Sequence, residues 1–102
     1  MLQPILKNNL QKVAELCKQH HVEKLYAFGS VCTEHFNDES DIDLLYRFKS
    51  NFPLDSYEAN YLDFEAKIQQ LLNREVDLVP EKYLSNPYFI KKVNETKTLV
   101  YG

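Results

Sequence analysis

The sequence has no tryptophan, one methionine, two cysteines and only two glycines among its 102 residues. Two cysteines cannot supply the disulfide framework on which small secreted domains depend, so we expect reduced thiols and a cytoplasmic protein. No apolar run approaches the roughly 20 residues of a membrane-spanning helix. The first residues turn polar too soon for a signal peptide, so none is expected. These shortages argue against a secreted or membrane-embedded protein.

A surplus of positive charge is also missing. The chain carries 12 lysines and arginines against 15 aspartates and glutamates, which gives a formal net charge of −3. Proteins that bind nucleic acids neutralise phosphates with lysine and arginine, so a nucleic acid is not the expected direct partner. In contrast, 44% of the residues are hydrophobic and 13% are aromatic, which is enough for one core. We predict a single domain over residues 1–102.

A short apolar run over residues 25–28 ends abruptly at Gly29 and Ser30. Such a run of strand-forming residues closed by glycine predicts a buried strand that leads into a turn. Glycine there permits a positive φ angle and lets another group approach the backbone closely. We expect a short helix over residues 31–36 to follow. Its free N–H groups and the Ser30 hydroxyl would then suit a phosphate.

A second predicted strand, over residues 41–48, carries two carboxylates. Asp41 and Asp43 project to one face because residues i and i+2 of a strand share a side, and Ile42 and Leu44 point to the other face. Neighbouring carboxylates repel each other unless protons or cations neutralise them. Oxygen ligands of this kind suit Mg²⁺, which proteins commonly hold with one or two carboxylates plus substrate phosphates.

A third acidic residue comes from the next predicted strand, over residues 74–79. Val76 and Leu78 face one way, whereas Glu75 and Asp77 face the other. A site that binds two metal ions for phosphoryl chemistry needs a further carboxylate beside the first pair. The spacing alone leaves Glu75 and Asp77 as competing candidates for that role.

The chain therefore contains three motifs in a fixed order: Gly29-Ser30, after ten further residues Asp41-Ile42-Asp43, and later Val76-Asp77-Leu78-Val79. Together they resemble the nucleotidyltransferase superfamily of the DNA polymerase β type, and in particular its minimal domains, such as the MntA-type antitoxins. The resemblance covers nearly the whole chain. It implies an α/β fold with a small mixed β-sheet and flanking helices. It also favours Asp77 over Glu75 as the third carboxylate.

The same resemblance implies a function. Asp41, Asp43 and Asp77 would be both the catalytic residues and the ligands of Mg²⁺, expected as two ions, while Gly29 and Ser30 would hold the phosphates of ATP. The implied reaction moves AMP from ATP to a hydroxyl group and releases pyrophosphate. Minimal domains of this family often adenylylate a tyrosine on an all-helical HEPN toxin. The leading hypothesis is therefore the antitoxin of such a toxin–antitoxin pair.

Two other functions stay open: nucleotidyl transfer to a small molecule such as an aminoglycoside, and neutralisation of a partner by contact with little catalysis. The second is suggested by a departure from the family pattern. Many members carry an arginine soon after Gly-Ser, whereas residues 31–34 here are Val-Cys-Thr-Glu. Arg47, Lys49 or Arg74 would have to supply the basic contact. Taken singly, each aspartate could also simply cap or solvate a strand end.

Helical periodicity predicts two long helices. The first spans residues 4–20 and carries an apolar stripe that includes Cys17. The second spans residues 55–73, with Asp55 and Glu58 spaced like a capping box. Its stripe of aromatic and aliphatic residues over positions 57–71 is interpreted as core rather than as a base-stacking platform.

The remaining elements follow from local patterns. Asn86 followed by Pro87 is typical of a helix start, with asparagine as the N-cap and proline in the first turn. Residues 98–101 predict a short terminal strand. The alternation of helices and strands along the chain indicates an α/β layered fold.

Several residues of types that are often catalytic or metal-binding are assigned to structural or surface roles. His20 and His21 lack companion ligands at a metal-binding spacing, so we interpret them as solvated or capping residues. Cys17 and Cys32 are assigned to packing because no partner base lies nearby in the sequence. His35 is assigned to the surface.

Overall fold

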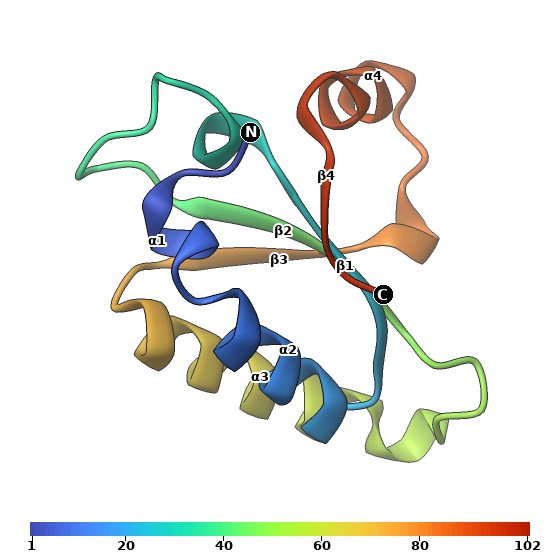
Figure 1. Cartoon of the computed structure of the whole chain (residues 1–102). Helices are drawn as coiled ribbons and strands as arrows, with labels where there is room; N and C mark the ends of the chain where they lie inside the picture. The colour runs from blue at the N-terminus through green and yellow to red at the C-terminus, as the bar shows by residue number, and fades with distance from the viewer.

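The computed structural model describes the backbone of residues 1–102 and every side chain except that of Tyr83. One mixed sheet runs through the molecule in the strand order β3-β2-β1-β4 (Figure 1). The strands are β1 (Val22–Phe28), β2 (Ile42–Phe48), β3 (Val76–Pro80) and β4 (Thr98–Tyr101). β1 pairs antiparallel with both β2 and β4, whereas β2 and β3 are parallel. The predicted α/β fold with a small mixed sheet is confirmed.

The helices flank this sheet on two sides. They are α1 (Pro4–Lys7), α2 (Leu10–Gln19), α3 (Tyr57–Leu72) and α4 (Pro87–Thr96), and three short 3₁₀ turns are η1 (Gly29–Cys32), η2 (Leu54–Ser56) and η3 (Glu81–Tyr83). α2 and α3 lie side by side over one face, and α4 lies on the other side beside β4 (Figure 1). None of the helices in the described residues is long and apolar enough to cross a membrane.

Alternating residues of β2 bury side chains on both faces of the sheet, as expected for a central strand. Ile42 and Leu44 are fully buried in the large core under α2 and α3. Leu45 faces the other way and packs with Phe28 and with Val93 of α4 in a smaller core. Because side chains alternate between the two faces along a strand, Asp43 lies on the same face as Leu45, which is the face that α4 covers.

Two helix predictions are wrong in detail. The helix expected over residues 4–20 is broken between α1 and α2, where the Asn9 amide donates to the Ile5 carbonyl at 2.8 Å and so competes with the backbone ladder. The helix expected over residues 31–36 is only the single turn η1. Thr33 ends it, because its backbone N–H and its hydroxyl both donate to the Ser30 carbonyl at 2.9 Å.

The two predicted helix starts have opposite outcomes. α3 begins at Tyr57, and neither Asp55 nor Glu58 forms the expected capping box, because no side chain caps its first turn. Asn86 does cap α4, since its Oδ1 accepts hydrogen bonds from the backbone N–H groups of Tyr88 and Phe89 at 2.9 and 3.3 Å.

His20 is not solvated, contrary to one of the two expected roles. It ends α2 and is buried, with Nδ1 2.7 Å from the Leu16 carbonyl and Nε2 2.6 Å from Asp63 Oδ2 of α3. The ring thus caps its own helix and ties it to the next one. His21 is exposed and stacks on the Phe52 ring, with the centroids 4.7 Å apart.

The packing assignments are confirmed. Cys17 and Cys32 are buried, and burial raises the pKa of the Cys17 thiol to about 12. His35 is exposed. The stripe of α3 forms core, because Phe64 and Ile68 are fully buried under the sheet.

Candidate functional site

Strand register brings the predicted acidic residues to one end of the sheet. Asp43 pairs with Asp77 across the parallel strands β2 and β3, and on its other side it pairs with Phe28, the last residue of β1. Asp41 directly precedes β2 and has the same parity as Asp43. All three aspartates therefore lie where β1 ends and where β2 and β3 begin, on the face that carries α4.

The charges of these residues act on one another. The pKa of Asp43 is raised from 3.8 to about 6 by burial first, and then by the negative charges of Asp77 and Asp41. Glu75 is not among these causes. Asp41 and Asp77 are exposed and Asp43 is half-buried. Within the described residues none of the three carboxylates has a hydrogen bond or an ion pair, so nothing there offsets their repulsion.

Gly29 has the conformation that the sequence predicts. Its φ angle is +75°, in the left-handed region that L side chains rarely adopt. A Cβ atom added there would lie 2.5 Å from Oδ2 of Asp43. Glycine is therefore required twice, for the turn and for the close approach of the carboxylate.

The helix expected after Gly29 is shortened to the single turn η1. The Gly29 N–H donates to Oγ1 of Thr96, at the end of α4, at 2.7 Å. With η1 only four residues long, no helix continues from the turn. The Ser30 hydroxyl makes no hydrogen bond within the described part of the chain, so the predicted phosphate contact at Gly29-Ser30 stays a prediction.

The basic residues suggested for the triphosphate lie elsewhere. The Arg47 Nε and Nη1 atoms lie 2.8 Å from Glu23 Oε2 and 3.1 Å from Glu81 Oε1, toward the far end of β2. Lys49 follows the far end of that strand. The Arg74 guanidinium donates to backbone carbonyls of the loop between β1 and β2.

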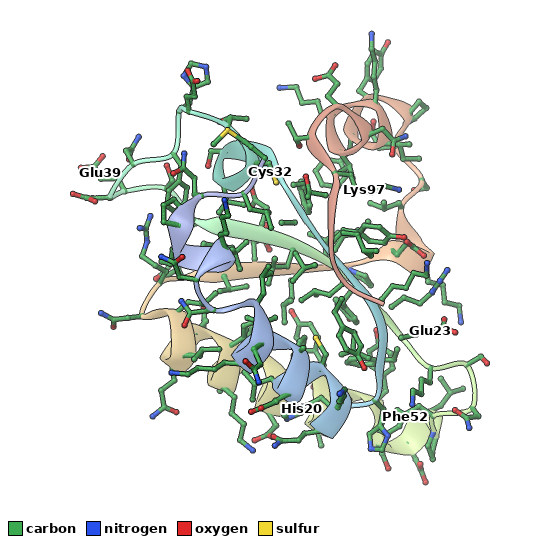
Figure 2. All side chains as sticks on the ribbon, viewed as in Figure 1. His20, Glu23, Cys32, Glu39, Phe52 and Lys97 are labelled. Carbon is green, nitrogen blue, oxygen red and sulfur yellow. The ribbon has the colours of Figure 1, made fainter. Side chains whose placement is uncertain are left out.

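Sequence reasoning missed Lys97, which the fold places on the aspartate face. Its Nζ lies 4.8 Å from the ring centroid of Tyr26, two residues before Phe28 on β1. Figure 2 labels Lys97 beside the sheet and Glu39 at the outer tip of the β1–β2 loop. No local pattern marks Lys97, because its position depends on the return of the chain after α4.

The aspartates supply the oxygen atoms that a magnesium site needs, but they are not arranged in the geometry of such a site. In the part of the chain that the structure describes, no group of three histidine, cysteine, aspartate or glutamate side chains is arranged to hold a metal ion. The three carboxylates nevertheless share one sheet end, and none of them has a hydrogen bond or ion pair within the described residues. Their oxygen donors fit Mg²⁺, whose charge would offset the repulsion that raises the pKa of Asp43.

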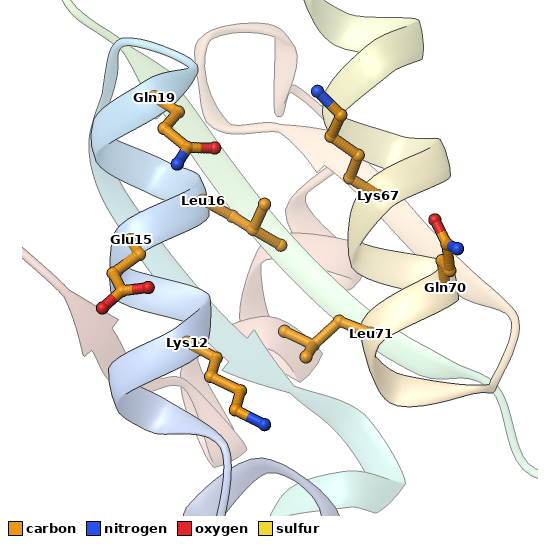
Figure 3. A pocket seen from close by; sticks show the side chains of 7 residues that line it. All are labelled: Lys12, Glu15, Leu16, Gln19, Lys67, Gln70 and Leu71. Atoms are coloured by element: carbon orange, nitrogen blue, oxygen red, sulfur yellow. The ribbon is translucent and has the colours of Figure 1, made fainter.

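A hollow between α2 and α3 is separate from this site. It has a volume of about 300 Å³ and is lined by Lys12, Glu15, Leu16, Gln19, Lys67, Gln70 and Leu71 (Figure 3). Five of these seven side chains are polar, and the hollow lies over the sheet face opposite the aspartates. Another groove, of about 400 Å³, lies at the far ends of β2 and β3 and also contains no aspartate.

Known proteins resemble this chain over most of its length. Residues 11–102 match the family profile described as Polymerase beta, Nucleotidyltransferase. A proposed protein adenylyltransferase of Methanocaldococcus jannaschii is 32% identical over 92 residues, which cover 88% of this chain and 89% of that protein.

Solved structures share the fold. A proposed minimal nucleotidyltransferase superposes with a TM-score of 0.74 at 26% identity and covers 96% of this chain and 95% of its own. A chain from the complex of tri-AMPylated Shewanella oneidensis HEPN toxin with MNT antitoxin gives 0.65 at 19% identity, covering 95% and 72%. At that identity the second likeness concerns the fold alone.

Proposed function

Because this chain belongs to the polymerase beta nucleotidyltransferase family, we propose that it transfers AMP from ATP to a hydroxyl group of a partner protein. One observation carries the proposal. The register that pairs Asp43 with Asp77 gathers the acidic residues of two strands beside the Gly29 turn, where a carboxylate–metal site for a triphosphate can form.

Asp41, Asp43 and Asp77 would hold Mg²⁺, expected as two ions. When bound, Mg²⁺ supplies the positive charge that draws in the triphosphate and offsets the charge that develops on it. Asp43 is central, because it is flanked by both other aspartates and touches the Gly29 turn. The Ser30 hydroxyl and the Lys97 ammonium group are the donors available for the phosphate oxygens on this face.

The chain's own groups would carry the proton and align the reactants. The acceptor oxygen forms a bond to the α-phosphorus, while the bond from that phosphorus to the bridging oxygen breaks and pyrophosphate leaves. Asp77 is exposed at the sheet end and would take the proton of the attacking hydroxyl. Positioning and charge neutralisation would supply most of the rate, as in phosphoryl transfer in general.

The acceptor we propose is a tyrosine on a small helical HEPN-type toxin, which makes this chain an antitoxin. Two observations support a protein acceptor: the relative that is 32% identical is named as a protein adenylyltransferase, and the fold matches a chain from an AMPylated toxin–antitoxin complex. Transfer to a small molecule has no such support.

The test uses the purified chain with a candidate HEPN-type toxin, which is sought as a gene for a small helical protein beside this one. The pair is incubated with ATP and Mg²⁺, and the partner is weighed by mass spectrometry. We expect a mass gain of one or more AMP groups that is lost with Asp41→Ala and with Asp43→Ala.

A second function, neutralisation by contact alone, is favoured by one observation. No arginine follows Gly29-Ser30 at the usual family position, and Arg47 and Arg74, which could have replaced it, are engaged by other groups. If the partner gains no mass and both aspartate variants still silence the toxin, contact is the mechanism and the transferase proposal is wrong.

A further inference from the structure

We propose that Arg74 is a positioning residue, which fixes Asp41 relative to Asp77 and thereby sets the affinity of the site for a divalent cation. The inference rests on the proposed function, since it assigns a role within the same site. The contacts of Arg74 that the structure describes are all with the loop before Asp41.

Three contacts join Arg74 to this loop. Its Nη2 atom donates to the Asn37 carbonyl at 2.7 Å and also to the Ser40 carbonyl. Its guanidinium carbon lies 4.5 Å from the ring centroid of Phe36, a cation–π contact. Planar stacking combined with donation to two carbonyls suits a guanidinium and not an ammonium group.

Hydrogen bonds within the loop close it independently of Arg74. Asn37 and Ser40 bond to each other twice, from the Asn37 N–H to Ser40 Oγ at 3.1 Å and from the Ser40 N–H to the Asn37 carbonyl at 3.1 Å. Asn37 Oδ1 also accepts from the Glu39 N–H at 2.8 Å. Arg74 therefore binds a turn whose shape is already defined by its own hydrogen bonds. The position of this turn is in this way tied to that of β3.

Asp41 lies between two tethers to the same segment. The Ser40 carbonyl, on one side, is held by Arg74, and the Ile42 N–H, on the other side, donates to the Glu75 carbonyl at 3.0 Å. Asp77 follows that segment two residues later. One short stretch of chain therefore sets the spacing between Asp41 and Asp77, although the two residues are 36 positions apart in the sequence.

Arg74 also carries a positive charge that is not paired with an acidic side chain in the described part of the chain. Its partners are carbonyls and a ring, and within the described residues it forms no ion pair, whereas Arg47 is bound to Glu23 and Glu81. Five acidic residues lie between positions 34 and 43. Within the described residues the guanidinium therefore meets this loop through carbonyls and a ring, and not through its acidic side chains.

The test measures binding of Mn²⁺ to the full chain by electron paramagnetic resonance, with no nucleotide and no partner. The variants are Arg74→Met, Arg74→Lys, Asp41→Asn and the double variant Arg74→Met/Asp41→Asn. Arg47→Met is the matched control, because it removes a guanidinium from the other end of the strand. Circular dichroism and thermal melts verify that each variant folds.

We expect Arg74→Met to weaken Mn²⁺ binding about tenfold, the range typical of residues that orient metal ligands. Asp41→Asn should weaken it by a similar factor, and the double variant should be no weaker than Asp41→Asn alone, since Arg74 acts through Asp41. Arg74→Lys should fold and keeps the charge, but it loses the planar donor group. Its affinity for Mn²⁺ should therefore stay at least about threefold weaker than that of the native chain. Arg47→Met should leave the affinity within about twofold.

Three results would overturn the inference. Native affinity in Arg74→Lys would mean that charge alone matters and not position. Additive losses in the double variant would mean that Arg74 acts independently of Asp41. If Asp41→Asn weakens binding and Arg74→Met does not, the site stands and the role of Arg74 is wrong; if the native chain binds no Mn²⁺, the proposed function itself fails.

Discussion

At the scale of the residue, Asp43 lies in surroundings that disfavour its negative charge. It is half-buried beside two other carboxylates and has no partner of its own within the described residues. Its pKa of about 6 means that the folded state binds a proton more readily than the unfolded chain, whose aspartates titrate near 3.8. Without a cation, the ionised side chain therefore destabilises the fold.

Asp43→Asn should stabilise the metal-free protein at pH 7. The pKa shift corresponds to about 1–2 kcal/mol once solvent screening is allowed for. The stabilising contribution of the protonated Asp43 is complete below about pH 4 and is lost as the pH rises to about 6. The gap between variant and native protein should therefore open across this window, as measured by urea unfolding at several pH values.

Asp38→Asn is the matched control for that measurement. Asp38 is exposed in the same acidic loop, so the variant changes the net charge equally without touching the site. Its unfolding free energy should differ from that of the native chain by less than about 0.5 kcal/mol at every pH. An equal gain from both variants would show that net charge, and not the environment of Asp43, is responsible.

Gly29→Ala tests the turn beside this carboxylate. The left-handed φ angle and the approach of Asp43 Oδ2 to 2.5 Å of the added Cβ should together cost about 1–3 kcal/mol of unfolding free energy. Asn73, which caps the end of α3 with a φ angle of +52°, supplies a control of opposite sign. Asn73→Gly should leave stability unchanged or raise it. A thermally neutral Gly29→Ala would contradict the close approach.

At the scale of the element, periodicity and parity predicted the strands well. The alternation in β2 and β3 placed Ile42 and Leu44 in the core and Asp43 and Asp77 on the other face, since a strand's period of two leaves no other arrangement once one face is buried. Asn86 was equally predictable, because its capping bonds are made to residues two and three positions ahead.

The elements that were predicted wrongly depend on contacts that a local pattern does not contain. Val31 and Cys32 are apolar and suggested a helix, but η1 ends after one turn because the Thr33 side chain returns to Ser30. For His20 the capping alternative is confirmed and the solvated one is wrong, and nothing nearby in the sequence reveals its partner Asp63, which lies 43 positions away. Periodicity identifies the buried face of an element and not where a side chain will interrupt it.

Asn86→Ala tests the element that covers the aspartate face. It removes the acceptor of two backbone N–H groups at the start of α4 and should cost about 1 kcal/mol of unfolding free energy. Asn94→Ala, on an exposed turn of the same helix, is the control and should be neutral or slightly stabilising because alanine favours a helix interior. Equal losses from the two variants, in parallel urea titrations, would contradict the capping role.

At the scale of the whole molecule, the sequence located the aspartates but not the residues that connect them to the rest of the fold. Three aspartates could be assigned to one sheet end from motif and parity. The hydrogen bond from Gly29 to Thr96 spans 67 positions and the one from Arg74 to Ser40 spans 34, so neither could be anticipated. The candidate site is consequently a predictable set of acidic residues held in place by contacts that the sequence does not reveal.

The distribution of charge leads to the last prediction. A net charge of −3, with five acidic residues between positions 34 and 43, repels a triphosphate, so ATP should bind only with a divalent cation. ATP with Mg²⁺ at 100 times its dissociation constant should stabilise the protein by about 2.7 kcal/mol. Excess chelator should abolish the gain, and Asp43→Asn should lose it although that variant is more stable without ligand. Undiminished ATP affinity in chelator, measured by calorimetry, would contradict a metal-dependent site, because the acidic loop would then have to bind the triphosphate against its own charge.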